Sequence, residues 1–160
     1  MKASVLTIMC LAVAASLAMA AKSLAVKDLP PAVQKAVQEQ TKGAEIKNIS
    51  KETEHGVIQY EVETLVNGKH RDFNVDTKGV LVVVEEETAI DSIPAAAKAA
   101  ILKKVGSGKL GIVETVTKGA DTMYEAGYTG KDGKRHAVLV KPDGTETKDE
   151  PGPTPPKPSE

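Results

Sequence analysis

Acidic side chains and one histidine alternate with apolar residues along two neighbouring stretches of the chain, IQYEVETLV and KHRDFNVD. Alternation with a period of two places such residues on one face of extended strands. The candidate binding residues on this polar face are Glu61, Glu63, His70, Asp72 and Asp76. Carboxylates and an imidazole can complement the charge of a partner, and they can also hold a cation weakly. The pattern therefore predicts a binding face, with a merely solvated strand surface as the alternative.

The residues that catalysis needs do not occur in a recognisable arrangement. His70 and His136 fall on opposite phases of their strands, and His55 stands beside a glycine in an expected turn. The string GSGKLG lacks the spacing and the trailing Ser or Thr of a phosphate-binding loop, so it is interpreted as a helix stop. Strand spacing alone rarely builds a closed metal shell. We therefore predict no catalytic residue, no cofactor and no metal centre.

Charge and cysteine content exclude further classes. Lysine and arginine number 21 against 22 for aspartate and glutamate, both signs are interspersed, and the formal net charge is −1. Without a basic stripe, no nucleic-acid binding is expected. The single cysteine, Cys10, falls in an apolar segment at the N-terminus that we expect to be removed. The mature chain would then have no disulfide, no thiol nucleophile and no Cys-ligated metal.

Both ends of the chain are expected to lie outside the fold. Residues 1–20 carry Lys2, then an apolar run, then Ala-Met-Ala, the features of a signal peptide cleaved between Ala20 and Ala21. A retained membrane anchor is the alternative, but the run is somewhat short for a span of about 20 residues. We therefore predict a periplasmic or secreted bacterial protein with no membrane association after cleavage. The proline-rich residues 148–160 are predicted to be disordered.

Two amphipathic helices and several strands must position the polar face. The segment LPPAVQKAVQEQTKG has proline at a helix start and stops at Gly43, and IPAAAKAAILKKVGSG repeats this pattern and stops at Gly106. Asn67-Gly68 predicts a two-residue hairpin of type I′. In the strand before this turn, Ile58, like the alternate residues that follow it, is expected to face inward.

The strands after the hairpins differ between the two halves of the chain. The run VLVVV at residues 80–84 is apolar on both faces, so its strand is expected near the junction between the halves, whereas the polar TETKD suits an outer edge. Glu85, Glu86 and Glu87 are interpreted as a solvated strand end that leads into a linker.

These elements occur twice in one register. Leu29 matches Ile93 and Tyr60 matches Tyr124 at an offset of 64, and beyond one inserted turn residue the offset becomes 65. Such self-similarity predicts an internal duplication. The predicted segments are a signal peptide at 1–20, a lead at 21–28, repeat 1 at 29–87, a linker at 88–92, repeat 2 at 93–147 and the tail at 148–160.

The repeated features resemble the PepSY-like family, which is also described as beta-lactamase-inhibitor-like. They are the Leu-Pro-x-x-Val helix start at Leu29, the tyrosine at Tyr60, the turn with Gly-Lys, and the Val-Asp-x-x-Gly that ends at Gly79. The family consists of small exported bacterial domains, often in tandem. The resemblance, from about Leu29 to Thr147, implies an α+β fold of two tandem repeats, each a helix followed by a four-stranded antiparallel sheet.

Two functions are consistent with the sequence. The first is an exported, non-catalytic binding module, inhibitor-like by resemblance, that uses the open polar face of its antiparallel sheet. The alternative is a periplasmic protein that binds a small ligand or a cation through the same residues. The expected partner is therefore an unidentified protein or small ligand.

Overall fold

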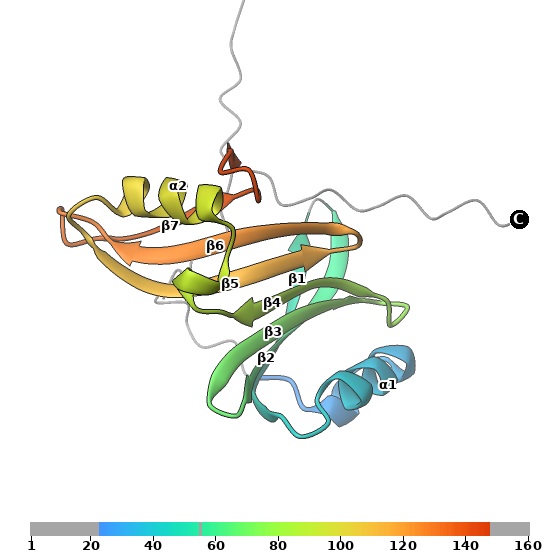
Figure 1. The fold of residues 1–160 in the computed structure, drawn as a ribbon. Helices are drawn as coiled ribbons and strands as arrows, with labels where there is room; N and C mark the ends of the chain where they lie inside the picture. The colour runs from blue at the N-terminus through green and yellow to red at the C-terminus, as the bar shows by residue number, and fades with distance from the viewer. Residues whose placement is uncertain (1–22, 55, 148–160) are drawn as a thin grey trace, which may run out of the picture.

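The computed structural model describes residues 23–54 and 56–147, which form two α-helices, two short 3-10 helices and eight strands (Figure 1). The first half contains η1 (Val26–Asp28), α1 (Pro31–Gln40), β1 (Glu45–Glu54), β2 (Val57–Val66), β3 (Lys69–Asp76) and β4 (Leu81–Glu87). The second half contains η2 (Ile90–Ser92), α2 (Ala95–Val105), β5 (Lys109–Lys118), β6 (Asp121–Thr129), β7 (Arg135–Val140) and β8 (Glu146–Thr147). The predicted signal peptide, its cleavage site and the proline-rich tail lie outside the described residues.

Each α-helix begins and ends where local sequence chemistry allows. Pro31 opens α1, where a missing N–H costs nothing. The helix ends at Thr41, whose backbone N–H and hydroxyl both donate to the Val37 carbonyl, at 2.9 and 2.8 Å. α2 ends at Gly106, which has a φ of 56°. Both stop positions agree with the sequence prediction to within a few residues.

The strands form one continuous antiparallel sheet in the order β1-β2-β3-β4-β5-β6-β7-β8. Each half contributes four of these strands, and the sequence left open whether the two halves share one sheet. The halves meet where Val84 pairs with Thr117 and Glu87 pairs with Glu114. β4 lies at the junction and β8 at the outer edge, as the sequence predicts. Glu85, Glu86 and Glu87 end β4, as the sequence predicts, and Glu86 is exposed, but all three also pair with β5 across the junction and Glu85 and Glu87 are half-buried.

Both helices pack on the same face of this sheet. Val33 and Val37 of α1 lie in one core with Phe73 and Val75, and Val84 packs against that core. Val84 pairs directly with Thr117, and β5 residues on the same side as Thr117 face α2. Paired residues in a ladder point to the same face. In Figure 1 the helices appear at opposite ends of the molecule because the sheet twists between them.

The helix α2 has a core of its own, and a smaller apolar cluster lies on the other face of the sheet. Ala97, Ile101 and Val105 of α2 contact buried residues of β5, β6 and β7. On the face opposite the helices, Val83, Val116 and Met123 form a separate buried cluster that spans the junction. Both faces of the central strands are therefore covered by side chains at the junction.

One predicted inward residue is exposed. Ile58 is 38% exposed, whereas Tyr60 and Val62, further along the same strand, are buried. Ile58 lies before the first β2–β3 pair, Gln59 with Asp76, so no strand residue of β3 covers it. Ile58 therefore lies on the predicted side of β2, but its position at the end of the strand leaves its side chain exposed.

The edge strand β1 is long but charged, and a register shift interrupts it between Ile46 and Asn48. Charges and irregularities on an edge strand oppose pairing with other chains. Its outer side is covered at one point, where the N–H of Leu24 donates to the carbonyl of Ile49 at 2.9 Å. No helix among the described residues is long and apolar enough to cross a membrane.

Candidate functional site

The candidate residues lie on the sheet face opposite the helices. Tyr60 and Val62 face the α1 core, so the alternate residues of β2 point the other way. Register extends this face across β3, β4 and β5. We call it the acidic face, and its carboxylates are Glu52, Glu61, Glu63, Asp72, Glu85, Glu87 and Glu114. Lys118 is buried at one end of the same face.

Glu61 and Glu63 are neighbours on β2, and β1 supplies hydrogen bonds to both. The Ser50 hydroxyl donates to Glu61 at 3.3 Å, and the Asn48 amide donates to Glu63 at 2.9 Å. Burial, followed by the adjacent Glu52 carboxyl, raises the pKa of Glu61 to about 8. Glu61 therefore carries a proton at neutral pH.

Asp72 is close to Glu63 and His70, and its carboxylate forms a hydrogen bond that helps to hold β2 and β3 together. Its Oδ1 accepts the backbone N–H of Thr64 at 2.8 Å, and the Thr64 hydroxyl donates to the carbonyl of Arg71. These side-chain bonds replace part of the β2–β3 ladder. Burial raises the pKa of Asp72, partly offset by the Thr64 N–H and by His70, and the Glu63 charge adds to the increase.

Asp76 lies at the end of β3 on the same face as the other candidate residues, opposite Gln59. Its Oδ1 accepts the backbone N–H groups of Lys78 and Val80, at 2.8 and 2.9 Å, and so closes the turn after β3. Such turns are a common use of aspartate. One oxygen of Asp76 is thus engaged by the backbone, and its role in binding stays a prediction.

The acidic face continues into the second half, which the sequence-based set did not include. Burial raises the pKa of Glu114, and the Asp72 and Glu87 charges add to it while His70 lowers it. The backbone N–H of His70 donates to Glu87 at 3.2 Å. His70, Asp72, Glu87 and Glu114 thus interact across the β3–β4–β5 junction. The apolar run of β4 predicted that junction from the sequence. Setting residues 114–116 of β5 antiparallel to residues 85–87 of β4 would have placed Glu114 opposite Glu87, on the acidic face.

A cavity of about 490 Å³ opens at the end of this junction. It is lined by Val66, Asn67, Lys69, His70, Arg71, Glu86, Glu87, Thr88 and Thr115. Arg71 is fixed there by Glu86 at 3.1 Å and by the side-chain oxygen of Gln40 at 2.8 Å. His70 is exposed in this cavity and is the imidazole that a partner would meet.

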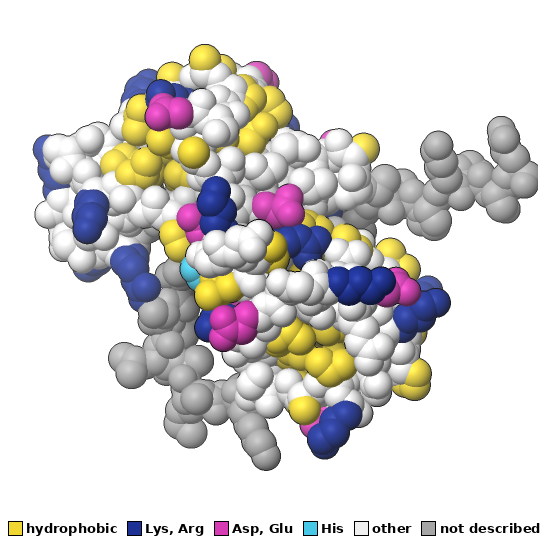
Figure 2. Space-filling view, turned by 60° about the horizontal axis from the view of Figure 1, so that its bottom comes forward, with side chains coloured by type: hydrophobic (Ala, Val, Ile, Leu, Met, Phe, Trp, Pro, Cys, Tyr) yellow, Lys and Arg dark blue, Asp and Glu magenta, His cyan; other side chains and the backbone are white. Residues whose placement is uncertain are grey.

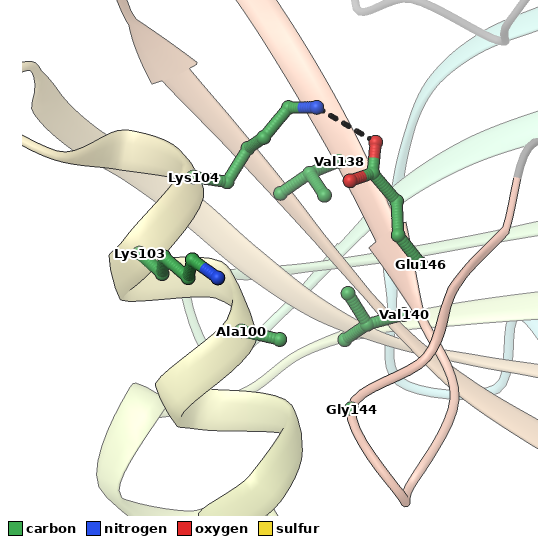
Figure 3. A pocket seen from close by; sticks show the side chains of 7 residues that line it. All are labelled: Ala100, Lys103, Lys104, Val138, Val140, Gly144 and Glu146. Carbon is green, nitrogen blue, oxygen red and sulfur yellow. Dashed lines mark hydrogen bonds and ion pairs between the residues drawn. The ribbon is translucent and has the colours of Figure 1, made fainter.

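A second cavity of about 330 Å³ lies between α2 and β7 (Figure 3). Ala100, Val138 and Val140 form its apolar wall, and Lys104 bridges to Glu146 at 2.8 Å across it. The charges at its rim are thus partly paired with each other, and we assign it no ligand.

The remaining titratable groups are dispersed. His136 stacks on Tyr128 with ring centroids 5.3 Å apart, and its Nε2 lies 3.1 Å from Asp132, far from His70 in the sheet order. Figure 2 shows basic and acidic side chains interspersed over the face in view. Among residues 23–54 and 56–147, no group of His, Asp and Glu is close enough to hold a metal ion.

No protein-family model matches the chain, and no curated protein matches its sequence. Solved structures share its fold. A proposed periplasmic protein from Bacteroides eggerthii DSM 20697 has a TM-score of 0.58 at 16% identity, over 74% of this chain and 85% of that one. A DUF2874 family protein from Bacteroides uniformis ATCC 8492 has a TM-score of 0.57 at 16% identity, over 73% of this chain and 85% of that one. Another DUF2874 family protein, from Bacteroides ovatus ATCC 8483, has a TM-score of 0.54 at 12% identity, over 78% and 92%. At these identities the likeness is one of fold.

Proposed function

We propose that the protein is an exported, non-catalytic binding module that uses its acidic face to bind a partner. The observation that carries this proposal is the gathering of carboxylates from β1 to β5 on the sheet face that no helix covers. Burial and mutual repulsion raise the pKa values of Glu61, Asp72 and Glu114. A positively charged group that approached this face would relieve that repulsion, which favours a cationic partner.

The proposal also covers the internal duplication of the chain and its export. We infer that the chain is a tandem duplication of a PepSY-like unit. Two glycines lie equally close to the two helices, which supports this: a Cβ on Gly79 would lie 2.6 Å from the Ala32 carbonyl oxygen, and a Cβ on Gly144 would lie 2.7 Å from the Ala96 carbonyl oxygen.

Export to the periplasm, after cleavage between Ala20 and Ala21, is part of the same proposal, and the periplasmic assignment proposed for the structural neighbour from Bacteroides eggerthii supports it. The intact mass of the exported protein tests the cleavage.

The alternative function is binding of a small ligand through the junction cavity. The exposed His70 and Lys69 side chains at that cavity favour it over a cation site. Calorimetry with divalent metal ions is expected to show no binding near neutral pH, because the described acidic residues do not converge on one point.

The test is a pull-down from periplasmic extract with a charge-reversed bait, Glu63→Lys with Glu87→Lys. Glu61 is left unchanged because its raised pKa keeps most of it uncharged near neutral pH, and Asp72 because it accepts the Thr64 N–H in place of part of the β2–β3 ladder. Glu63 and Glu87 each accept one hydrogen bond, from Asn48 and from the His70 N–H, so circular dichroism is used to check that the bait is folded. We expect the double variant to lose the partner at least tenfold, and wild-type binding to weaken with salt, because exposed charges are screened within about 10 Å at 0.1 M.

The matched control is Asp28→Lys with Glu39→Lys, which makes the same charge change at exposed positions of η1 and α1. It should retain the partner. Equal binding by both double variants would show that the acidic face is only solvated surface.

A further inference from the structure

The edge strand β7 is only partly covered by β8. The two strands pair at Leu139 and Val140. Before these residues β7 runs from Arg135 to Val138, and no described residue pairs with this stretch on the β8 side. The other edge strand, β1, is hydrogen-bonded on its outer side at Ile49. Within the described part of the chain, the start of β7 is therefore an open stretch of the sheet edge.

The backbone groups that face this open side belong to Arg135 and Ala137. Lys141, further along the chain, donates its N–H on the β8 side at 2.9 Å, whereas the carbonyl of Lys134 accepts a hydrogen bond on the β6 side at 2.8 Å. Backbone groups of successive residues point to opposite sides of a strand, so Arg135 and Ala137 point to the same side as Lys141. Each of these two residues thus offers one donor and one acceptor to an added strand.

A cavity beside this edge can receive a side chain from such a strand. It is the cavity of about 330 Å³ between α2 and β7, and Figure 3 shows Ala100, Val138 and Val140 pointing into the same gap. No small ligand is assigned to this cavity, but it lies on the helix side of the sheet. A residue opposite Val138 on an added strand would point to that side and contact Ala100 and Val138, because paired residues share a face.

The first half of the chain shows which side chain fits this position. There β4 is a full strand, in which Val84 pairs with Phe73 and packs, like Ala36, against the α1 core. Phe73 matches Val138 at the offset of 65, and Ala36 matches Ala100 at the offset of 64. The second half thus has a smaller side chain in place of Phe73 and no described residue in place of Val84. A β-branched apolar side chain on an extended strand fits the space that remains.

The charges around the open edge favour an acidic strand. Lys103 of α2 and Arg135 of β7 are exposed and have no charged partner among residues 23–54 and 56–147. Lys104 and His136, in contrast, are paired with acidic neighbours at 2.8 and 3.1 Å. A second copy of the same edge would bring further cations, and like charges oppose pairing between edge strands. An acidic segment would instead be attracted.

We propose that the open edge of β7 binds an extended segment of a partner protein, which pairs antiparallel with residues 135–138, places a β-branched side chain in the α2–β7 cavity and carries acidic residues after it. With that side chain opposite Val138, the residue three positions later lies opposite Arg135, where a carboxylate would meet an unpaired guanidinium. The chain's own residues 148–151, Lys-Asp-Glu-Pro, include no β-branched side chain for the cavity. The site takes an acidic partner and the acidic face a cationic one, so each proposal can fail without the other.

A synthetic peptide, Val-Val-Val-Glu-Glu-Glu-Thr, tests the site. It has the sequence of residues 82–88, which include the strand residues that pair with β3 in the first half. Amide hydrogen exchange of the protein is followed by NMR with peptide added to about 5 mM, since so small a contact implies a dissociation constant on the order of 1 mM.

We expect exchange of the Arg135 and Ala137 N–H groups to slow about fivefold, because an added strand protects them. The N–H groups of Lys51 and Thr53 are the internal control. They point outward from β1, on the same side as that of Ile49, and should change by less than about twofold.

Two variants make the test specific. Ala137→Pro removes the outward N–H and leaves the bonds to β6, so it should abolish the protection of Arg135, whereas Thr53→Pro makes the same change at the other edge and should not. Circular dichroism checks that both are folded. Lys103→Glu with Arg135→Glu should weaken binding of the acidic peptide at least about fivefold, and should bind Val-Val-Val-Lys-Lys-Lys-Thr more tightly than the wild type does.

Several results would overturn the proposal. They are an absence of protection at Arg135 and Ala137, equal protection at Lys51 and Thr53, and acidic-peptide binding that neither Ala137→Pro nor the charge reversal weakens. Protection without peptide that disappears when residues 148–160 are removed would overturn it in favour of the chain's own C-terminal segment. Protection without peptide that rises with protein concentration would overturn it in favour of a second copy.

Discussion

At the scale of single residues, several turns place a residue at positive φ. Asn67 and Gly68 both have positive φ, 52° and 81°, as the type I′ turn predicted from their sequence requires. Gly79 also has a positive φ, 83°, and in addition its Cα faces the first turn of α1. A glycine with both constraints fixes the contact between a turn and a helix.

Gly79→Ala is therefore expected to lower the free energy of unfolding by about 3 kcal/mol, through strain at positive φ and displacement of α1. A Cβ there would lie 2.6 Å from the Ala32 carbonyl oxygen, which is backbone and cannot rotate away. Gly43→Ala is the matched control, since Gly43 has a φ of 79° and open space around its Cβ. It should cost only about 1 kcal/mol. Urea denaturation of both variants measures the difference, and equal costs would show that the helix contact is not tight.

At the scale of elements, the junction between β4 and β5 joins the two halves. Helix packing contributes separately to each half, through two cores on the same face. On the opposite face, Val83, Val116 and Met123 bury the junction without any helix. This small cluster, together with the β4–β5 ladder, couples one half to the other.

Val116→Ala is expected to destabilise the protein by about 2 kcal/mol, since it removes buried methyl groups from a site that is 0% exposed. Ile112→Ala on the same strand is the control, because Ile112 is 44% exposed, and should cost about 0.5 kcal/mol. Thermal unfolding of both variants should remain a single transition. Two separate transitions in Val116→Ala would mean that the halves are coupled mainly through this cluster.

At the scale of the whole molecule, the acidic face links stability to pH. The pKa values of Glu61, Asp72 and Glu114 are all raised in the folded protein. A carboxyl group with a raised pKa binds its proton more tightly in the folded state than in the unfolded state. Its stabilising contribution is therefore complete below the unfolded pKa near 4.5, and it is lost as pH rises toward the folded pKa, about 8 for Glu61.

The free energy of unfolding should accordingly fall between pH 5 and pH 9. Glu61 alone is expected to account for on the order of 2 kcal/mol, less than its shift implies, because the carboxyl is partly solvated. Urea denaturation at pH 5, 7 and 9 measures this slope, and Glu61→Gln should flatten it. A wild-type protein that is equally stable at pH 5 and pH 9 would contradict the assignment of bound protons to this face.

The sequence by itself determined the local structure of this protein. Proline at the helix start, glycine after the helix end, the Asn67-Gly68 turn and the period-two alternation act over a few residues, so they can be recognised without knowing the fold. The same local chemistry predicted that the 80–84 run would lie at the junction and that the polar 145–147 stretch would lie at the edge. The duplication read from matching offsets remains a proposal.

Only the tertiary structure decided which carboxylates meet. Glu114 joins His70, Asp72 and Glu87 because β5 pairs with β4 in one specific register, and residues distant in sequence do not reveal that register. The structure also shows that one oxygen of Asp76 accepts two backbone N–H groups of a turn. The physical reason is that alternation fixes only the face on which a side chain lies. Strand pairing decides which side chains are its neighbours, and backbone hydrogen bonds decide whether its polar atoms are available to a partner.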